Sequence, residues 1–158
     1  MTENVDTAVR KTVTVAAPRQ RAFEVFTAEF GRWWPKEHHI SEVDVADFVL
    51  EPKEGGRWYE VGVDGTECDA ARVTAFQPPD RIVIAWHLDS NWQYDPDPAH
   101  ASEVELRFIP EGPTHTRVEL EHRGFERHGA GADGIRDGVD GPQGWGYCLD
   151  LYAKHVAA

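Results

Sequence analysis

The sequence has few cysteines, a shortage of basic residues and no long apolar run. Its 158 residues include two cysteines, and 16 Lys and Arg stand against 28 Asp and Glu, for a formal net charge of −12. Two cysteines do not make a disulfide framework in a chain of this length, so we expect Cys68 and Cys148 to be reduced thiols. The charge balance argues against binding to nucleic acids or anionic membranes, because both need clustered Lys and Arg.

Signals for membrane insertion or secretion are also missing. No stretch approaches the ~18 apolar residues of a membrane span. The first eight residues have neither the basic nor the apolar region of a signal peptide. We therefore expect a cytoplasmic protein with a flexible N-terminus at residues 1–8 and a single domain at residues 9–158.

Familiar catalytic and cofactor motifs are absent as well. The sequence contains no GxSxG or Walker motif. His38 and His39 are adjacent, so their side chains diverge, and no third ligand follows at a recognisable spacing. We predict no metal and no cofactor, and we expect both histidines to be exposed or to anchor a loop.

Large aromatic side chains, in contrast, are abundant. The chain has six Trp and seven Phe, which require either a thick core or an aromatic-lined pocket. For a single Trp, the core is the simpler explanation, because aromatic residues dominate cores in general.

Hydrophobic periodicity predicts an antiparallel sheet interrupted by helices. Residues 9–15 alternate as a first strand. Ala17-Pro18 then marks the start of a helix, and an apolar stripe through Phe23, Phe26 and Phe30 predicts two short helices that are separated at Gly31. Six further strands are expected at residues 43–50 (with a bulge near residue 47), 57–63, 66–76, 81–88, 102–109 and 116–125.

The C-terminal part predicts one long helix. Residues 129–141 are rich in Gly and Asp, so we expect a flexible loop that can include a short helical turn at 135–139. Asp140 can cap a following helix, with Gln143 completing a capping box. The helix is expected at residues 142–157, about 24 Å long, with one apolar face made by Trp145, Cys148, Leu149, Tyr152 and Val156. Strands and helices do not alternate as βαβ, so the fold class is α+β with an antiparallel sheet.

Several segments, taken in order, resemble a known family. They read VRKTVTVAAPRQRAFEVFT, GRWWP, LEPKEGGRWYEVGVDG, RVTAFQPPDRIVIAWHL, VELEHRGFERHG and GWGYCLDLYAKHV. From Val9 to Val156 the chain is similar to the START-like SRPBCC superfamily, and within it to the branch named after the activator of heat-shock protein 90 ATPase. The resemblance implies a helix-grip fold, in which a curved sheet of seven antiparallel strands surrounds a long C-terminal helix, with two short helices after the first strand. It also implies a cavity between sheet and helix, but no invariant catalytic set.

The candidate ligand-binding residues are those expected to face that cavity. They are Trp34, Trp58, Trp86, His122, Trp145, Leu149 and Tyr152. The alternative is that the same side chains form an ordinary filled core.

His122 is the candidate for chemistry. It occupies an inward position beside Val118 and Leu120, where a neutral imidazole could orient a ligand or act as a general base. The simpler interpretation is a core histidine that is hydrogen-bonded to a backbone carbonyl.

Glu60 has two possible orientations. If Trp58 points inward, so does Glu60, which is then a buried carboxylate with a raised pKa. If Tyr59, Val61 and Val63 point inward, Glu60 is solvated. The three apolar residues favour this second orientation.

Three functions fit these observations, in this order. The first is binding of a small, mostly apolar or aromatic molecule, such as a lipid or polyketide. The second is a cyclase or hydrolase that uses the same cavity, with His122 as the acid-base residue, together with Glu60 or Tyr152. The third, implied by the resemblance alone, is a regulator of a heat-shock protein 90 ATPase. The resemblance also leaves a homodimer open.

Overall fold

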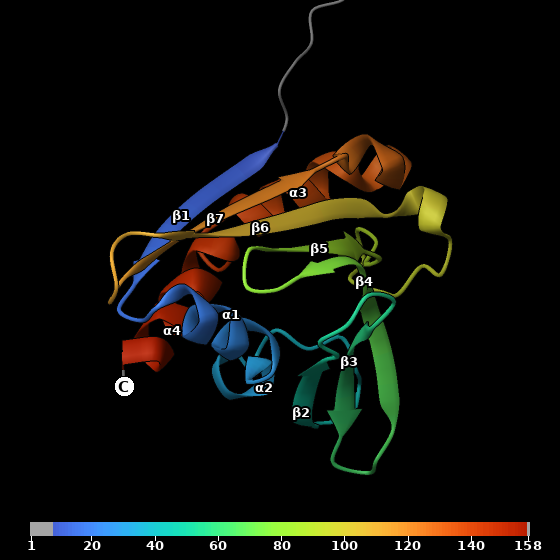
Figure 1. Ribbon diagram of the computed structural model, residues 1–158. Helices are drawn as coiled ribbons and strands as arrows, with labels where there is room; N and C mark the ends of the chain where they lie inside the picture. Colours follow the sequence, from blue (N-terminus) through green and yellow to red (C-terminus); the bar gives the residue numbers. More distant parts are fainter. Residues whose placement is uncertain (1–7, 158) are drawn as a thin grey trace, which may run out of the picture.

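The computed structural model describes residues 8–157, and its core is one curved sheet of seven antiparallel strands (Figure 1). Residues 1–7, which belong to the expected flexible N-terminus, lie outside the described part. The strands are β1 (Val9–Val15), β2 (Val45–Leu50), β3 (Arg57–Gly62), β4 (Glu67–Gln77), β5 (Arg81–Trp86), β6 (Ser102–Pro110) and β7 (Thr116–Arg123). The helices are α1 (Arg19–Thr27), α2 (Phe30–Trp33), α3 (Ala132–Asp140) and α4 (Trp145–Ala157), with 3₁₀ turns at Pro98–His100 and Phe125–Gly131.

The order of the strands in the sheet is β1-β7-β6-β5-β4-β3-β2. Strands β2 to β7 therefore form a meander, and β1 pairs with β7 at the far edge, where Val13 lies opposite Val118. The register of β2 against β3 shifts between Val45 and Asp47, which confirms the expected bulge. The fold class and the helix-grip arrangement are confirmed.

The helices cover the concave face of the sheet. Helix α4 packs along β1 and against α1, while α2 lies next to β2 (Figure 1). Side chains of β5, β6 and β7 that face α4 and α1 are fully buried, as the alternation predicts: Ile82, Ile84, Val104, Leu106 and Leu120. No helix among residues 8–157 is long and apolar enough to cross a membrane.

The break between the first two helices is not at Gly31. It falls at residues 28–29, and Gly31 lies inside α2. A Cβ atom at Gly31 would lie 2.2 Å from Oδ1 of Asp47 and 2.5 Å from the carbonyl oxygen of Phe48. The glycine therefore allows α2 to approach β2 closely, and this contact cannot be inferred from the helix pattern alone.

The segment 129–141 is more ordered than expected. Helix α3 covers Ala132–Asp140, and its Ile135 and Val139 are buried. Burial of this apolar side stabilises a helix that contains two glycines and three aspartates, which have poor intrinsic helix propensity.

Helix α4 begins three residues later than expected, at Trp145. Asp140 does not cap it, because Asp140 is the last residue of α3 and its carboxylate lies 2.8 Å from Nζ of Lys11. The helix has 13 residues and is about 20 Å long. Gly144 precedes it, and a Cβ atom there would lie 2.0 Å from the carbonyl oxygen of Val139, so the chain turns tightly between α3 and α4.

Candidate functional site

A cavity of about 360 Å³ lies between the concave face of the sheet and the first turns of α4. The sheet contributes residues of β3, β4 and β5. The other walls come from α4, the segment after α2, the loop that contains Leu88 and Trp92, the C-terminal end of α3 and the residues between α3 and α4. Exposed residues such as Glu37, His39 and Gln143 also line it, so the cavity opens to the surface.

Four tryptophans form the inner wall. Their rings meet edge to face: the centroids of Trp34 and Trp58 are 4.8 Å apart, those of Trp58 and Trp86 5.7 Å, and those of Trp86 and Trp145 5.6 Å. The ring centroids of Trp145 and Trp34 are 5.8 Å apart, so the four rings pack together as one cluster. Edge-to-face contacts at these distances are favourable. The structure thus brings four of the seven predicted ligand-binding residues to one cavity, and their role in binding stays a prediction.

The other three predicted residues do not line the cavity. Leu149 and Tyr152 lie further along α4, where side chains fill the space. The Tyr152 hydroxyl donates to the carbonyl oxygen of Ala22 at 2.6 Å, and its ring contacts those of Phe26 and Trp33. Burial raises the pKa of Tyr152, so its hydroxyl stays protonated.

His122 is fully buried behind the tryptophan wall and is hydrogen-bonded to side chains, not to a backbone carbonyl. The indole N–H of Trp145 donates to Nδ1 of His122 at 3.1 Å. The proton of the neutral imidazole is therefore on Nε2, which donates to the Ser102 hydroxyl at 2.7 Å. That hydroxyl in turn donates to Nε2 of His128, also at 2.7 Å.

The surroundings of His122 keep it neutral. Burial, together with the nearby His128, lowers its pKa to about 3. His122 contacts the cavity wall from behind, through its hydrogen bond to Trp145 and its ring contact with Trp86, so its geometry is that of a positioning residue. Its catalytic role stays a prediction.

Glu60 faces the cavity, and the favoured solvated orientation is wrong. Its side chain is 2% exposed and lies on the same face of β3 as Trp58, whereas Val63 is 67% exposed. The carboxylate accepts hydrogen bonds from the backbone N–H groups of Ile40 at 2.6 Å and Ser41 at 3.0 Å. These bonds, together with burial of the Trp58 ring, outweigh the smaller apolar gain of the opposite orientation.

No Lys or Arg among residues 8–157 is paired with Glu60, and the charge that favours its ionised form is that of the exposed His39. Burial raises its pKa, and the two backbone hydrogen bonds only partly oppose this effect. A raised pKa within a cavity is a common property of functional carboxylates.

His38 is a second polar residue at the cavity, and of the two expected alternatives it fits anchoring of the loop and not exposure. It is half-buried, its ring contacts those of Trp34 and Tyr147, and its Nδ1 lies 3.7 Å from Sγ of Cys148. Burial lowers its pKa. His39 is exposed, and its Nδ1 lies 2.9 Å from the carbonyl oxygen of Ser41, so it does anchor the loop.

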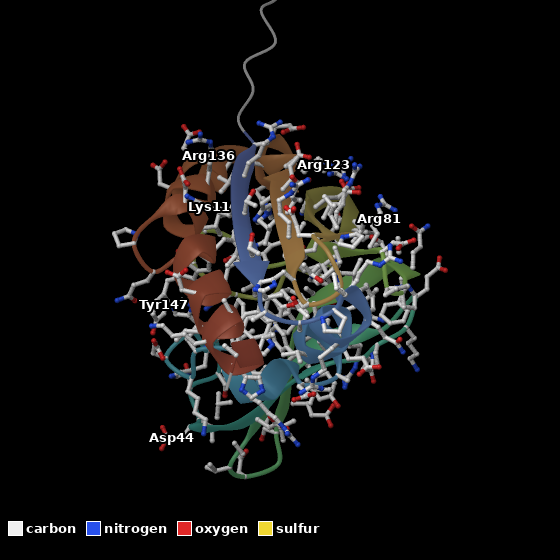
Figure 2. The ribbon with its side chains drawn as sticks, turned by 60° about the vertical axis from the view of Figure 1, so that its left-hand side comes forward. Lys11, Asp44, Arg81, Arg123, Arg136 and Tyr147 are labelled. Carbon is white, nitrogen blue, oxygen red and sulfur yellow. The ribbon has the colours of Figure 1, made fainter. Side chains whose placement is uncertain are left out.

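The rim of the cavity carries a hydrogen bond between α4 and the segment after α2. The Tyr147 hydroxyl donates to Glu37 at 2.5 Å. Tyr147 lies on α4 on the side of the molecule shown in Figure 2. Next to it, Cys148 is buried, and burial raises the pKa of its thiol to about 12. A thiol that stays protonated is a poor nucleophile.

Two further features come from tryptophans at the cavity. The indole nitrogen of Trp86 is buried and has no hydrogen-bond partner within the described part of the chain. Trp92 is 41% exposed, has a positive φ of 58°, and its ring contacts that of Trp86. The position of Trp92 could not be predicted, because the loop at residues 90–99 has no hydrophobic periodicity.

Residues 8–157 contain no group of three or more His, Cys, Asp or Glu side chains that could hold a metal ion. Both cysteines are free.

Comparison with known families identifies the chain. The sequence model described as Activator of Hsp90 ATPase homolog 1-like protein matches residues 16–157. The chain belongs to this family. This match also confirms the resemblance to the START-like superfamily over nearly the whole length of the chain.

Solved structures of this fold add more specific relatives. An anthrahydroquino-gamma-pyrone synthase, Txn09, is 42% identical, with a TM-score of 0.66 over 93% of this chain and 95% of the synthase. The self-sacrificing resistance protein CalC from Micromonospora echinospora is 35% identical, with a TM-score of 0.70 over 97% of this chain and 96% of CalC. CalU16 from the same organism is 22% identical, with a TM-score of 0.60 over 98% of this chain and 82% of CalU16, and shows the fold alone. No curated protein sequence matches the chain.

Proposed function

We propose that this protein binds a flat polycyclic aromatic molecule of the polyketide type in the tryptophan-walled cavity. The observation that carries the proposal is the cluster of four packed tryptophans that forms the inner wall of a cavity of about 360 Å³. Small-molecule sites typically measure 300–1,000 Å³ and combine aromatic walls with a few polar groups. Flat ring systems gain both buried area and favourable ring contacts in such a site.

The relatives support the same class of ligand. Txn09, at 42% identity, is named for a product that contains fused aromatic rings. CalC, at 35% identity, is named as a resistance protein and not as a synthase, so the relatives of this chain are not all named for a reaction. Both likenesses extend over nearly the whole of this chain, the cavity included.

The unpaired indole N–H of Trp86 is a further argument for a ligand. A buried donor without a partner costs about 1–3 kcal/mol. A ligand with a carbonyl or ether oxygen near this group would provide the missing acceptor.

Ligand screening tests the proposal. Purified protein is mixed with hydroxyanthraquinones, fatty acids and sterols, and its melting temperature and tryptophan fluorescence are recorded. At 100 times its Kd, a ligand adds about 2.7 kcal/mol of stability, or roughly 5–10 °C for a domain of this size. We expect this shift from the anthraquinones and none from the fatty acids and sterols.

Two adjacent tryptophans offer a matched control. Trp34 lines the cavity, whereas Trp33 does not, and its indole N–H is bonded to the carbonyl oxygen of Val25. Trp34→Leu should weaken anthraquinone binding at least tenfold, while Trp33→Leu should lower stability and leave the affinity of the folded protein nearly unchanged. Anthraquinones that leave fluorescence and melting temperature unchanged would exclude this ligand class.

A synthase activity in the same cavity is the second candidate. It is favoured by the 42% identity to a pyrone synthase and by two groups suited to proton transfer, Glu60 with its raised pKa and His38, which burial keeps neutral. In such a reaction, a phenol oxygen adds to the β-carbonyl carbon of a neighbouring diketone, and loss of water leaves the γ-pyrone.

A simple substrate tests this reaction. The diketone 1-(2-hydroxyphenyl)butane-1,3-dione gives 2-methylchromone and water, which liquid chromatography separates from the substrate. We expect faster conversion with the protein than in buffer, and a loss of this acceleration in Glu60→Gln. Equal rates with and without protein would count against a synthase of this type.

The chaperone partner and the homodimer suggested by the resemblance stay predictions. Stimulation of a purified heat-shock protein 90 ATPase by this protein would test the first, and sedimentation analysis the second.

A further inference from the structure

Glu60 is a buried carboxylate with unused hydrogen-bonding capacity that faces the cavity. Each of its oxygens accepts one backbone N–H, from Ile40 and Ser41 respectively. An ionised carboxylate has about four acceptor positions. Roughly two positions therefore remain free, in a cavity whose other inner walls are indole rings.

The charge is not neutralised by the protein. The other titratable groups that line the cavity are Glu37, His38, His39 and Cys148, and of these only the exposed His39 favours the ionised form of Glu60. A buried charge without a close counter-ion is costly, so a donor supplied by a ligand is strongly favoured there.

The chemistry of this donor follows from a second unpaired group. The buried indole N–H of Trp86 needs an acceptor, and Trp86 and Glu60 lie two strands apart on the same concave face. Adjacent strands are ~4.8 Å apart, and Glu60 lies two residues (~6.6 Å) beyond Trp58, which is in line with Trp86. The backbones of the two residues are therefore roughly 12 Å apart, which is the scale of a ring system. An ammonium ligand could pair with Glu60 but offers no acceptor, whereas a hydroxylated aromatic carbonyl compound offers both.

We infer that Glu60 accepts a hydrogen bond from a ring hydroxyl of the ligand, so that the protein selects phenolic or enolic aromatic carbonyl compounds over their methyl ethers. This inference rests on the proposed function and adds the selecting residue. An O–H···O⁻ bond of this kind corresponds to a preference of roughly 10- to 100-fold.

The experiment compares two probes that differ by one methyl group. Binding of 2-hydroxyanthraquinone and 2-methoxyanthraquinone is measured by quenching of tryptophan fluorescence at pH 6.5, where the phenol is mostly protonated. Wild type should bind the hydroxyl probe 10- to 100-fold more tightly. Glu60→Gln should lose most of this preference and bind the methoxy probe within about threefold of wild type. The control is Glu24→Gln, an exposed residue of α1, which should change neither affinity.

The outcomes separate this inference from the function on which it rests. If wild type binds both probes equally, Glu60 is not a selecting residue, although the cavity still takes aromatic ligands. If wild type binds neither, the proposed function fails as well. Tighter binding of benzyltrimethylammonium than of the hydroxyl probe would overturn the inference in favour of a cationic ligand.

A measurement on wild type covers the case in which Glu60→Gln folds poorly. The side-chain carboxyl carbon of Glu60 is followed by NMR as pH is varied. The hydroxyl probe should move its titration midpoint and the methoxy probe should not. A midpoint that neither probe moves would overturn the inference.

Discussion

The two faces of the sheet each bury one carboxylate, and the two are partnered in opposite ways. On the convex face, Glu105 of β6 is 4% exposed and accepts hydrogen bonds from Arg81 and Arg123. On the concave face, Glu60 of β3 is 2% exposed and accepts only backbone N–H groups. Figure 2 shows Arg81 and Arg123 together on the side of the molecule away from Tyr147 in α4.

Burial raises the pKa of both carboxyls, but the arginines reverse the result at one of them. At Glu105, the hydrogen bonds and charges of Arg81, Arg123 and Arg107 outweigh burial and lower the pKa to about 2. At Glu60, burial dominates and the pKa is raised. Burial alone therefore does not distinguish the two carboxylates. The one that the protein leaves without a counter-ion, beside a cavity, is the candidate for a functional role.

The largest expected effect comes from breaking the paired site. Glu105→Gln should lower the free energy of unfolding by about 3 kcal/mol at pH 7, because it leaves three arginines facing one another across the sheet. Urea denaturation measures the loss, and Glu24→Gln on the exposed side of α1 serves as the control.

The pH dependence sharpens this result. Since the pKa of Glu105 falls from 4.5 to about 2 on folding, its stabilisation is present above pH 4.5 and is lost as the pH drops towards 2. Wild type should therefore lose its advantage over Glu105→Gln across this range. A difference that does not depend on pH would mean that the arginines do not stabilise the ionised form.

His122 is a third buried titratable group, and its hydrogen-bond partners are neutral side chains. His122→Leu leaves the indole N–H of Trp145 and the Ser102 hydroxyl without a partner, which should cost about 2–3 kcal/mol at pH 7.5. Because the pKa of His122 is lowered from 6.5 to about 3 on folding, wild type loses stability as the pH falls below 6.5, and the leucine variant does not.

The two proteins should therefore become nearly equal in stability by pH 4.5, as measured by chemical denaturation at a series of pH values. A gap that stays constant down to pH 4.5 would show that His122 titrates normally, and that its burial in the structure is not maintained in solution.

The sequence predicted the regular elements well because their periodicity is a physical consequence of one buried face. Alternation in β6 and β7, and the stripe on α4, were enough to define the sheet and the helix that it grips. The orientation of Glu60 could not be predicted in this way, since it depends on N–H groups of Ile40 and Ser41, in a loop without periodicity. Only a short helical turn at 135–139 was expected where α3 lies, for a related reason: the helix is stabilised by packing of Ile135 and Val139, and a composition rich in Gly and Asp gives no sign of it.

The unpaired carboxylate should respond weakly to the same type of substitution. Glu60→Gln removes a buried charge, which favours the folded state. It also places the side-chain NH₂ group opposite a backbone N–H, so one hydrogen bond is lost. The free energy of unfolding should therefore change by less than about 1 kcal/mol at pH 7. Its pH dependence has the opposite sign to that of Glu105. A raised pKa makes the folded state relatively more stable below pH 4.5 and less stable as the pH rises.

Carboxyl NMR titration of wild type compares the two sites directly. Glu105 should titrate with a midpoint of about 2, and Glu60 with a midpoint above 4.5. A Glu60 midpoint below 4.5 would indicate a cation close to it, and would remove the contrast between the two faces.

The smallest effect concerns Cys148, which shares the apolar wall with Glu60. Because burial raises the pKa of this thiol to about 12, only about one molecule in ten thousand carries the thiolate at pH 8. Cys68, on β4, is half-buried and lies outside the cavity wall. Iodoacetamide at pH 8 should therefore modify Cys68 first and leave Cys148 unmodified in the folded protein, as mass spectrometry of the digested protein would show. Rapid modification of Cys148 would mean that water enters this end of the cavity freely, and the same water would stabilise the Glu60 charge without any ligand. Protection of Cys148 supports a dry wall, in which Glu60 depends on a ligand hydroxyl.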